Sequence, residues 1–210
     1  MEIRKLVEET YDIIAAEYAK RHFAEITFNE QREMFLKMLA PGSLILDAGC
    51  GPGQDAVFFT ERGYRVIGID ISEGMLGIAR ERVPKAEFRR ADILATGFPD
   101  KTFDGIWALR SLIHVEKKDV LRVLNELKRI LRPGGLLFVG VLAGKGERIV
   151  PEPYDPTGKS KMFFNMFNKA EVEHLIKAAN FGLIRSEVKT KPVPELGQEC
   201  YIFVLARKSS

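Results

Sequence analysis

The feature that most restricts the fold is a glycine-rich turn between an apolar run and a helical segment. Leu44-Ile45-Leu46 leads directly into Asp47-Ala48-Gly49-Cys50-Gly51-Pro52-Gly53. Glycines at alternate positions permit positive φ angles and let a ligand approach the backbone closely. A helix that follows such a turn offers free N–H groups and the positive end of its dipole. The turn therefore predicts a nucleotide-like or amino-acid-like ligand.

The rest of the chain alternates apolar strands with helices. We predict strands at 44–46, 65–69, 86–91, 103–109 and 136–142, and helices at 54–62, 72–83 and 117–131. Continuous apolar strands separated by helices indicate a parallel sheet that is buried on both faces. The right-handed crossover rule then leaves a doubly wound α/β sandwich. Two final strands, at 183–190 and 199–206, bring the total to seven. A proline-containing loop joins them as a hairpin, so the last strand is expected to run antiparallel.

The length of 210 residues fits a single domain covering residues 1–210. Residues 1–40 are predicted to form a helical cap, with a second helix that begins at Thr27. Residues 41–143 would form the cofactor-binding core, and residues 144–167 a long connection that covers it. Residues 168–210 would form a last helix, capped by Asn168, and the two final strands.

Charge and cysteine content exclude several classes of protein. Lys and Arg total 32 and Asp and Glu 29, which gives a net charge of +3 without a long run of one sign. Binding to nucleic acid is therefore disfavoured, although it stays open. Cys50 and Cys200 make neither a disulfide framework nor a zinc site, and no metal is expected. Because the chain has no membrane-spanning run and no signal core, we expect a cytoplasmic protein with no membrane partner. The oligomeric state is not predicted.

Aspartates end three successive strands of the predicted sheet. These are Asp47, Asp70 and Asp92. Ligands of open α/β sheets bind at the carboxyl ends of the strands, where a carboxylate such as Asp70 can accept hydrogen bonds from both ribose hydroxyls. Asp92 can accept from an exocyclic amine. A single aspartate at a strand end is usually only a turn former or a helix cap, but three beside a glycine turn favour a ligand site.

Five segments together resemble the class I S-adenosylmethionine-dependent methyltransferases, and in particular their small-molecule branch. They are Leu44–Gly53, Val66–Ser72, Ala91–Ile93 with Phe98-Pro99, Phe103–Ala108 and Leu131–Leu137. The resemblance covers about residues 44–142. It implies a Rossmann-like fold, S-adenosylmethionine as the cofactor and S-adenosylhomocysteine as the product.

The resemblance also implies roles near the methionine part of the cofactor. Gly49 and Gly51 would line that part, and Asp47 would support their loop. The backbone near Ala108 and Leu109 would face the sulfonium.

Further roles concern the nucleoside. Asp70 would hold the ribose, with Ile71 and Met75 against the adenine. Asp92 and Ile93 would meet the adenine edge.

Aromatic residues of the first helix and a histidine complete the predicted site. Tyr11 and Tyr18 resemble residues that help to cover the cofactor, although a stripe that only packs the core explains them equally well. His114 follows the fourth strand and is a candidate general base, with a capping or packing role as the alternative. His22 and His174 are expected at the surface.

Three functions stay open at this stage. The first is methyl transfer to a small, partly apolar acceptor, with RNA or protein as alternative acceptors. The second is a nicotinamide-dependent oxidoreductase, which accounts for Gly51–Ala56 as a dinucleotide fingerprint and for Asp70, but not for Phe103–Ala108 or Pro133-Gly134-Gly135. The third is a non-catalytic partner subunit, against which the intact glycine turn and Asp70 argue.

Overall fold

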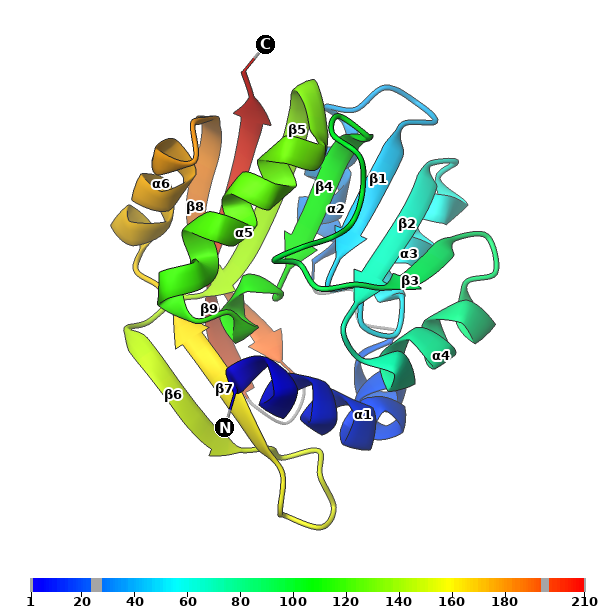
Figure 1. Ribbon diagram of the computed structural model, residues 1–210, viewed down its shortest axis with the longest axis vertical. Helices are drawn as coiled ribbons and strands as arrows, with labels where there is room; N and C mark the ends of the chain where they lie inside the picture. Colours follow the sequence, from blue (N-terminus) through cyan, green and yellow to red (C-terminus); the bar gives the residue numbers. More distant parts are fainter. Residues whose placement is uncertain (1, 24–27, 194–196, 210) are drawn as a thin grey trace.

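A computed structural model describes residues 2–23, 28–193 and 197–209. Its centre is a seven-stranded sheet with the strand order β3-β2-β1-β4-β5-β9-β8 (Figure 1). The strands are β1 (Leu44–Ala48), β2 (Arg65–Asp70), β3 (Glu87–Arg90), β4 (Phe103–Leu109), β5 (Leu131–Leu142), β8 (Phe181–Val193) and β9 (Gly197–Lys208). The strands β1 to β5 pair in parallel, and β9 runs antiparallel to both β5 and β8. The predicted doubly wound, mostly parallel sheet with an antiparallel last strand is confirmed.

Helices cover both faces of this sheet. They are α1 (Ile3–His22), α2 (Asn29–Leu36), α3 (Gln54–Glu61), α4 (Glu73–Arg82), α5 (Lys117–Ile130) and α6 (Lys169–Ala178), with a 3₁₀ turn η1 (Leu112–His114). In Figure 1, α5 crosses the near face, whereas α2 and α3 lie behind the sheet. The Ser72 hydroxyl caps α4 by accepting from the Met75 N–H, and the predicted Asn168 cap forms as a capping box with Glu171. Thr27, the predicted start of α2, lies outside the described residues.

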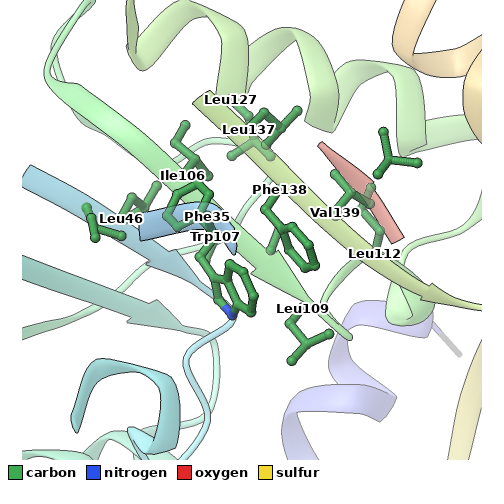
Figure 2. Packing of buried hydrophobic residues seen from close by; sticks show 14 of the residues in the cluster. Phe35, Leu46, Ile106, Trp107, Leu109, Leu112, Leu127, Leu137, Phe138 and Val139 are labelled. Carbon is green, nitrogen blue, oxygen red and sulfur yellow. The ribbon is translucent and has the colours of Figure 1, made fainter. Parts of the chain in front are cut away.

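The core is built around Trp107 of β4, which is fully buried (Figure 2). Its ring stacks on Phe138 of β5 at 3.9 Å between centroids. Phe35 of α2 packs against Trp107 at 5.4 Å. The helix α2 therefore packs into the main core, and the prediction that residues 1–40 form a cap is wrong for this helix. Phe35 and Leu36 bury their apolar surface in the main core beside the sheet.

Residues 144–167 contain two strands where the sequence predicts only a long connection. The strands β6 (Gly146–Pro151) and β7 (Lys161–Met166) pair antiparallel in a small sheet of their own. The strands lack the alternation that would identify them: β6 is almost entirely exposed, and the adjacent Met162 and Phe163 of β7 are both buried. Figure 1 shows this hairpin beyond the carboxyl ends of the central strands, next to α1.

The helix α1 and the hairpin share a second, smaller apolar cluster. Leu6 and Val7 of α1 pack with Met162 and Phe163 of β7, separately from the main core. The Thr10 hydroxyl adds a hydrogen bond to the carbonyl of Lys161 at 2.8 Å. These two elements, which we call the cover, extend across the carboxyl edge of the sheet.

Polar contacts hold the other side of α1 against α4. The Asp12 carboxylate accepts hydrogen bonds from the Ser72 hydroxyl at 2.6 Å and from the Gly74 N–H at 2.9 Å. A Cβ at Gly74 would lie 3.3 Å from the Asp12 backbone, so glycine permits this close approach. The carboxylate at the start of α4 also complements the helix dipole.

Candidate functional site

A cavity lies between the cover and the carboxyl ends of the central strands. It encloses about 1110 Å³, including the space at its mouth. The strand order reverses between β1 and β4, and the crevice at such a switch point is where open α/β sheets bind ligands. All of the predicted site residues except Asp47 and Ala108 line it: Tyr11, Tyr18, Gly49, Gly51, Asp70, Ile71, Met75, Asp92, Ile93, Leu109 and His114.

The glycine turn forms one wall of the cavity. Gly49 and Gly51 have φ angles of +76° and +51°, in the left-handed region that favours glycine. A Cβ on Gly49 would lie 2.6 Å from the Oγ of Ser111, whereas a Cβ on Gly51 would meet nothing within 4 Å. Gly49 thus lets the turn pack against the end of β4, and Gly51 leaves its side of the backbone open for a ligand.

The Asp70 carboxylate connects the glycine turn to the loop after β2. Its two oxygens accept from the Gly51 N–H at 2.9 Å and from the Ser72 N–H at 3.0 Å. Burial raises the pKa of Asp70, and the N–H groups of Ser72, Gly51 and Ile71 oppose that rise. Each carboxylate oxygen keeps a further lone pair, so the group can still accept from a ligand that carries neighbouring hydroxyls.

Asp92 reaches the cavity from the end of β3 but is engaged by the cover. Its Oδ1 accepts from the Leu94 N–H at 2.8 Å. Its Oδ2 forms an ion pair with Arg4 of α1. An exocyclic amine at Asp92 would therefore compete with the Arg4 guanidinium.

Asp47 is a predicted site residue that does not line the cavity. It is buried beneath the glycine turn, near the ion pair in which the Arg32 Nε donates to Asp55 at 2.5 Å. Burial and the Asp55 charge raise the pKa of Asp47 well above its usual value, and Arg32 opposes that rise. This position fits the implied support of the loop rather than direct contact with a ligand.

His114 joins the cover to the sheet through both ring nitrogens. Its Nδ1 lies 2.8 Å from the carbonyl oxygen of Phe163 in β7, and its Nε2 lies 2.7 Å from the Tyr11 hydroxyl. Burial lowers the pKa of His114 to about 4, so the ring is neutral at pH 7. A carbonyl only accepts, so Nδ1 carries the proton and Nε2 accepts from Tyr11. A neutral ring with both nitrogens occupied disfavours the general-base hypothesis and favours a structural role.

This pKa predicts a pH-dependent contribution to stability. The pKa of His114 is lower in the folded protein than the ordinary 6.5, so its contribution is complete above pH 6.5 and is lost as pH falls toward about 4. When the pH is lowered from about 7 to about 5, the free energy of unfolding measured with urea should fall by about 2 kcal/mol more in wild type than in H114Q. The control is H174Q, because His174 is exposed on α6. Equal losses in wild type and H114Q would contradict the prediction.

The surface position predicted for His22 is wrong. His22 is 1% exposed, and its Nε2 shares a 2.9 Å hydrogen bond with the hydroxyl of Tyr154, which lies between β6 and β7. Its ring also lies 4.5 Å from that of Tyr18. The unrecognised hairpin explains the error, because the loop that buries His22 is distant in sequence.

Sequence reasoning also missed Arg110, which lines the cavity directly after β4. The rule that ligands bind at the carboxyl ends of strands could have found it. Among the described residues, no group of three or more His, Cys, Asp or Glu side chains is placed to hold a metal ion. Within the same residues, no helix has the length and apolar character needed to span a bilayer.

The sequence is similar to those of known methyltransferases. The family described as "Methyltransferase domain" matches residues 45–135. The methyltransferase GfsG of Streptomyces halstedii is 35% identical over 115 residues, which are 51% of this chain and 41% of that protein. The 2-methyl-6-phytyl-1,4-hydroquinone methyltransferase of Synechocystis sp. is 36% identical over 120 residues, which are 55% of this chain and 37% of that protein. The chain thus spans about two fifths of the length of these relatives.

A solved structure supports the fold. The 1,6-didemethyltoxoflavin-N1-methyltransferase of Burkholderia thailandensis, solved with 1,6-didemethyltoxoflavin and S-adenosylhomocysteine bound, superposes with a TM-score of 0.71. The match covers 96% of this chain and 90% of that one at 21% sequence identity. At this identity the likeness establishes a shared fold.

Proposed function

We propose that the chain is a class I S-adenosylmethionine-dependent methyltransferase, which binds S-adenosylmethionine in the cavity and methylates a small, partly apolar acceptor. The observation that carries this proposal is the meeting of the glycine turn and the Asp70 carboxylate on one wall of the cavity. When bound, S-adenosylmethionine supplies a methyl group that is already activated on a sulfonium. The remaining tasks are to bind, to orient and to exclude water.

The residues of the cavity fit the parts of this cofactor. Asp70 is placed to accept from the ribose hydroxyls, and the apolar side chains of Ile71, Met75 and Ile93 offer a surface for the adenine. The open side of Gly51 leaves room for the amino-acid part against the backbone. These roles follow the resemblance, and the cavity supports them by bringing the residues together.

The acceptor end of the cavity is assigned to residues of the cover and of β4. Tyr11 and Tyr18, which the resemblance places over the cofactor, and Leu109, which it places beside the sulfonium, would also give this end aromatic and aliphatic surfaces. Burial raises the pKa of Tyr11 well above 10, so its hydroxyl stays protonated and continues to donate to His114. A small acceptor with an apolar body suits these walls, and a methyltransferase of a hydroquinone among the relatives supports this class.

Calorimetry tests the proposed function directly. We expect saturable binding of S-adenosylhomocysteine and no binding of NADH, because the resemblance extends beyond the glycine turn to five segments. Saturable heat with NADH and none with S-adenosylhomocysteine would replace the proposal with the oxidoreductase hypothesis. Binding of neither ligand would leave a non-catalytic module.

A further inference from the structure

The helix α3, whose first turn borders the cavity, begins without a capping side chain. Its N-cap is Gly53, the last residue of the glycine turn, with a φ angle of +90° and no side chain to accept the first N–H groups. Asp55 lies on the first turn of α3, and it is buried although it lines the cavity. The position of this turn therefore depends on contacts from other elements.

The helix α2 supplies one such contact through Arg32. The Arg32 Nε donates to the Oδ1 of Asp55 at 2.5 Å, and its Nη1 donates to the Oδ1 of Asn29 at 2.7 Å. The side chains of Arg32 and Asp55 are only 3% and 9% exposed. Because the pair is buried and the guanidinium is held at two points, it restricts the position of Asp55 more than a surface ion pair would.

The core in turn fixes the helix that carries Arg32. Phe35, one turn further along α2, packs against Trp107 at 5.4 Å and against Phe59 of α3 at 6.1 Å between ring centroids (Figure 2). Trp107 is paired with Asp47 in the register of β4 and β1, so these contacts lie directly beneath the glycine turn. Arg32 thus connects a rigid part of the core to the first turn of α3.

The charges beneath the glycine turn also depend on Arg32. Asp47 and Asp55 are both buried there, and the Asp55 charge acts to raise the pKa of Asp47, whereas the Arg32 charge acts to lower it. Loss of the guanidinium would leave two buried carboxyl groups without this cation. A buried charge that lacks a partner is costly, so the first turn of α3 would move to expose Asp55.

We infer that Arg32 is a positioning residue for the ligand wall: through Asp55 it fixes the first turn of α3 and, with it, the glycine turn. This inference rests on the proposed function. Arg32 is not among the residues that line the cavity, so it acts without touching the ligand. A displacement of about 1 Å in a binding loop reduces function roughly a hundred-fold, so a tether at this point controls affinity.

The test compares two variants that share the same residue at position 55. D55N keeps an oxygen that accepts from the Arg32 Nε, and Asp47 can then ionise to balance the guanidinium, so its affinity for S-adenosylhomocysteine should stay within about threefold of wild type. R32M/D55N removes the donor and both charges of the pair. Its affinity should fall roughly ten- to a hundred-fold below that of D55N.

Calorimetry measures these affinities, and urea unfolding measures the stability of each variant separately. An arginine with a merely structural role would change the free energy of unfolding while leaving the affinity of the folded protein unchanged. R32K adds a conservative variant, because lysine keeps the charge but lacks the planar fork that reaches Asp55 and Asn29 together. We expect R32K to bind S-adenosylhomocysteine roughly three- to ten-fold more weakly than wild type.

The same two helices provide a matched control at the other end of α3. The Arg62 Nε donates to Glu33 of α2 at 3.0 Å, and Arg62 is the C-cap residue of α3. Arg62 and Arg32 both lie over the ring of Phe58, at 3.5 Å and 5.4 Å from its centroid. R62M should therefore loosen the contact between α2 and α3 away from the cavity and leave the affinity for S-adenosylhomocysteine unchanged.

The inference is overturned if folded R32M/D55N binds S-adenosylhomocysteine as tightly as D55N, or if R62M weakens binding as much as R32M/D55N does. Should R32M/D55N not fold, R32K decides, and wild-type affinity in R32K overturns the inference. Failure of the proposed function looks different, because wild type itself would not bind S-adenosylhomocysteine.

Discussion

Replacement of Asp70 by alanine is expected to lower the affinity for S-adenosylhomocysteine roughly ten- to a hundred-fold, because hydrogen bonds to a charged acceptor contribute about 1.5–3 kcal/mol. The change removes the proposed acceptor for the ribose hydroxyls. It also removes the contact that holds the Gly51 N–H at 2.9 Å and thereby orders the glycine turn. Calorimetric titration of D70A and D70N measures the loss. D70N should lie between wild type and D70A, because the amide keeps one accepting oxygen.

Asp104 provides a matched control for this experiment. Its carboxylate also accepts a backbone N–H, that of Leu44 at 2.8 Å, but it lies at the start of β4 rather than at its carboxyl end. D104A should therefore lower folding stability while leaving ligand affinity near the wild-type value. If folded D70A binds S-adenosylhomocysteine as tightly as wild type, Asp70 only shapes the turn after β2.

The second large effect is expected for Gly49→Ala. The added Cβ would lie 2.6 Å from the Ser111 Oγ and 2.8 Å from its Cβ, so the glycine turn must move away from the end of β4. A shift of about 1 Å in a binding loop is enough to reduce function roughly a hundred-fold. We expect G49A to lose affinity for S-adenosylhomocysteine on that scale, measured by the same titration.

Two comparisons separate the clash from backbone strain. Gly63 has a φ of +82°, and a Cβ added there would meet nothing within 4 Å, so G63A should carry only the cost of a left-handed alanine, about 1–2 kcal/mol of stability. Adding Ser111→Gly to G49A removes the clashing atoms and should restore much of the affinity. If G49A binds normally, or if S111G restores nothing, contact between the turn and Ser111 is not what positions the ligand wall.

The strands and their order are accessible from sequence because each signal is local. The apolar run of β1, the glycine turn and the aspartates at strand ends are short patterns with a direct physical meaning. Asp70 can be predicted as a candidate ligand group because parallel strands bring their carboxyl ends to one edge. The same reasoning brings Asp92 to the cavity but cannot foresee Arg4, which reaches it from the distant helix α1.

The errors come from contacts between segments that are far apart in the chain. The aromatic residues of α2 fit a cap and a core equally well until Phe35 is seen against Trp107 (Figure 2). The surface prediction for His22 fails because its partner, Tyr154, belongs to a hairpin loop that the sequence does not reveal. The choice of which His114 nitrogen is protonated depends on the backbone carbonyl of Phe163. A contact with a backbone carbonyl of a distant residue cannot be predicted from residue types.

The separate apolar cluster of the cover has an evolutionary consequence. Leu6, Val7, Met162 and Phe163 pack among themselves, and none belongs to the core that holds the seven-stranded sheet. Substitutions at distant positions without shared partners add in their effects on the free energy of unfolding, so the effect of a change in this cluster does not depend on how the sheet core is packed. The walls of the proposed acceptor end can therefore change by drift or by directed evolution independently of the proposed nucleoside-binding edge. New acceptors are most accessible by changing α1 and the β6–β7 hairpin together, because each supplies half of one small interface.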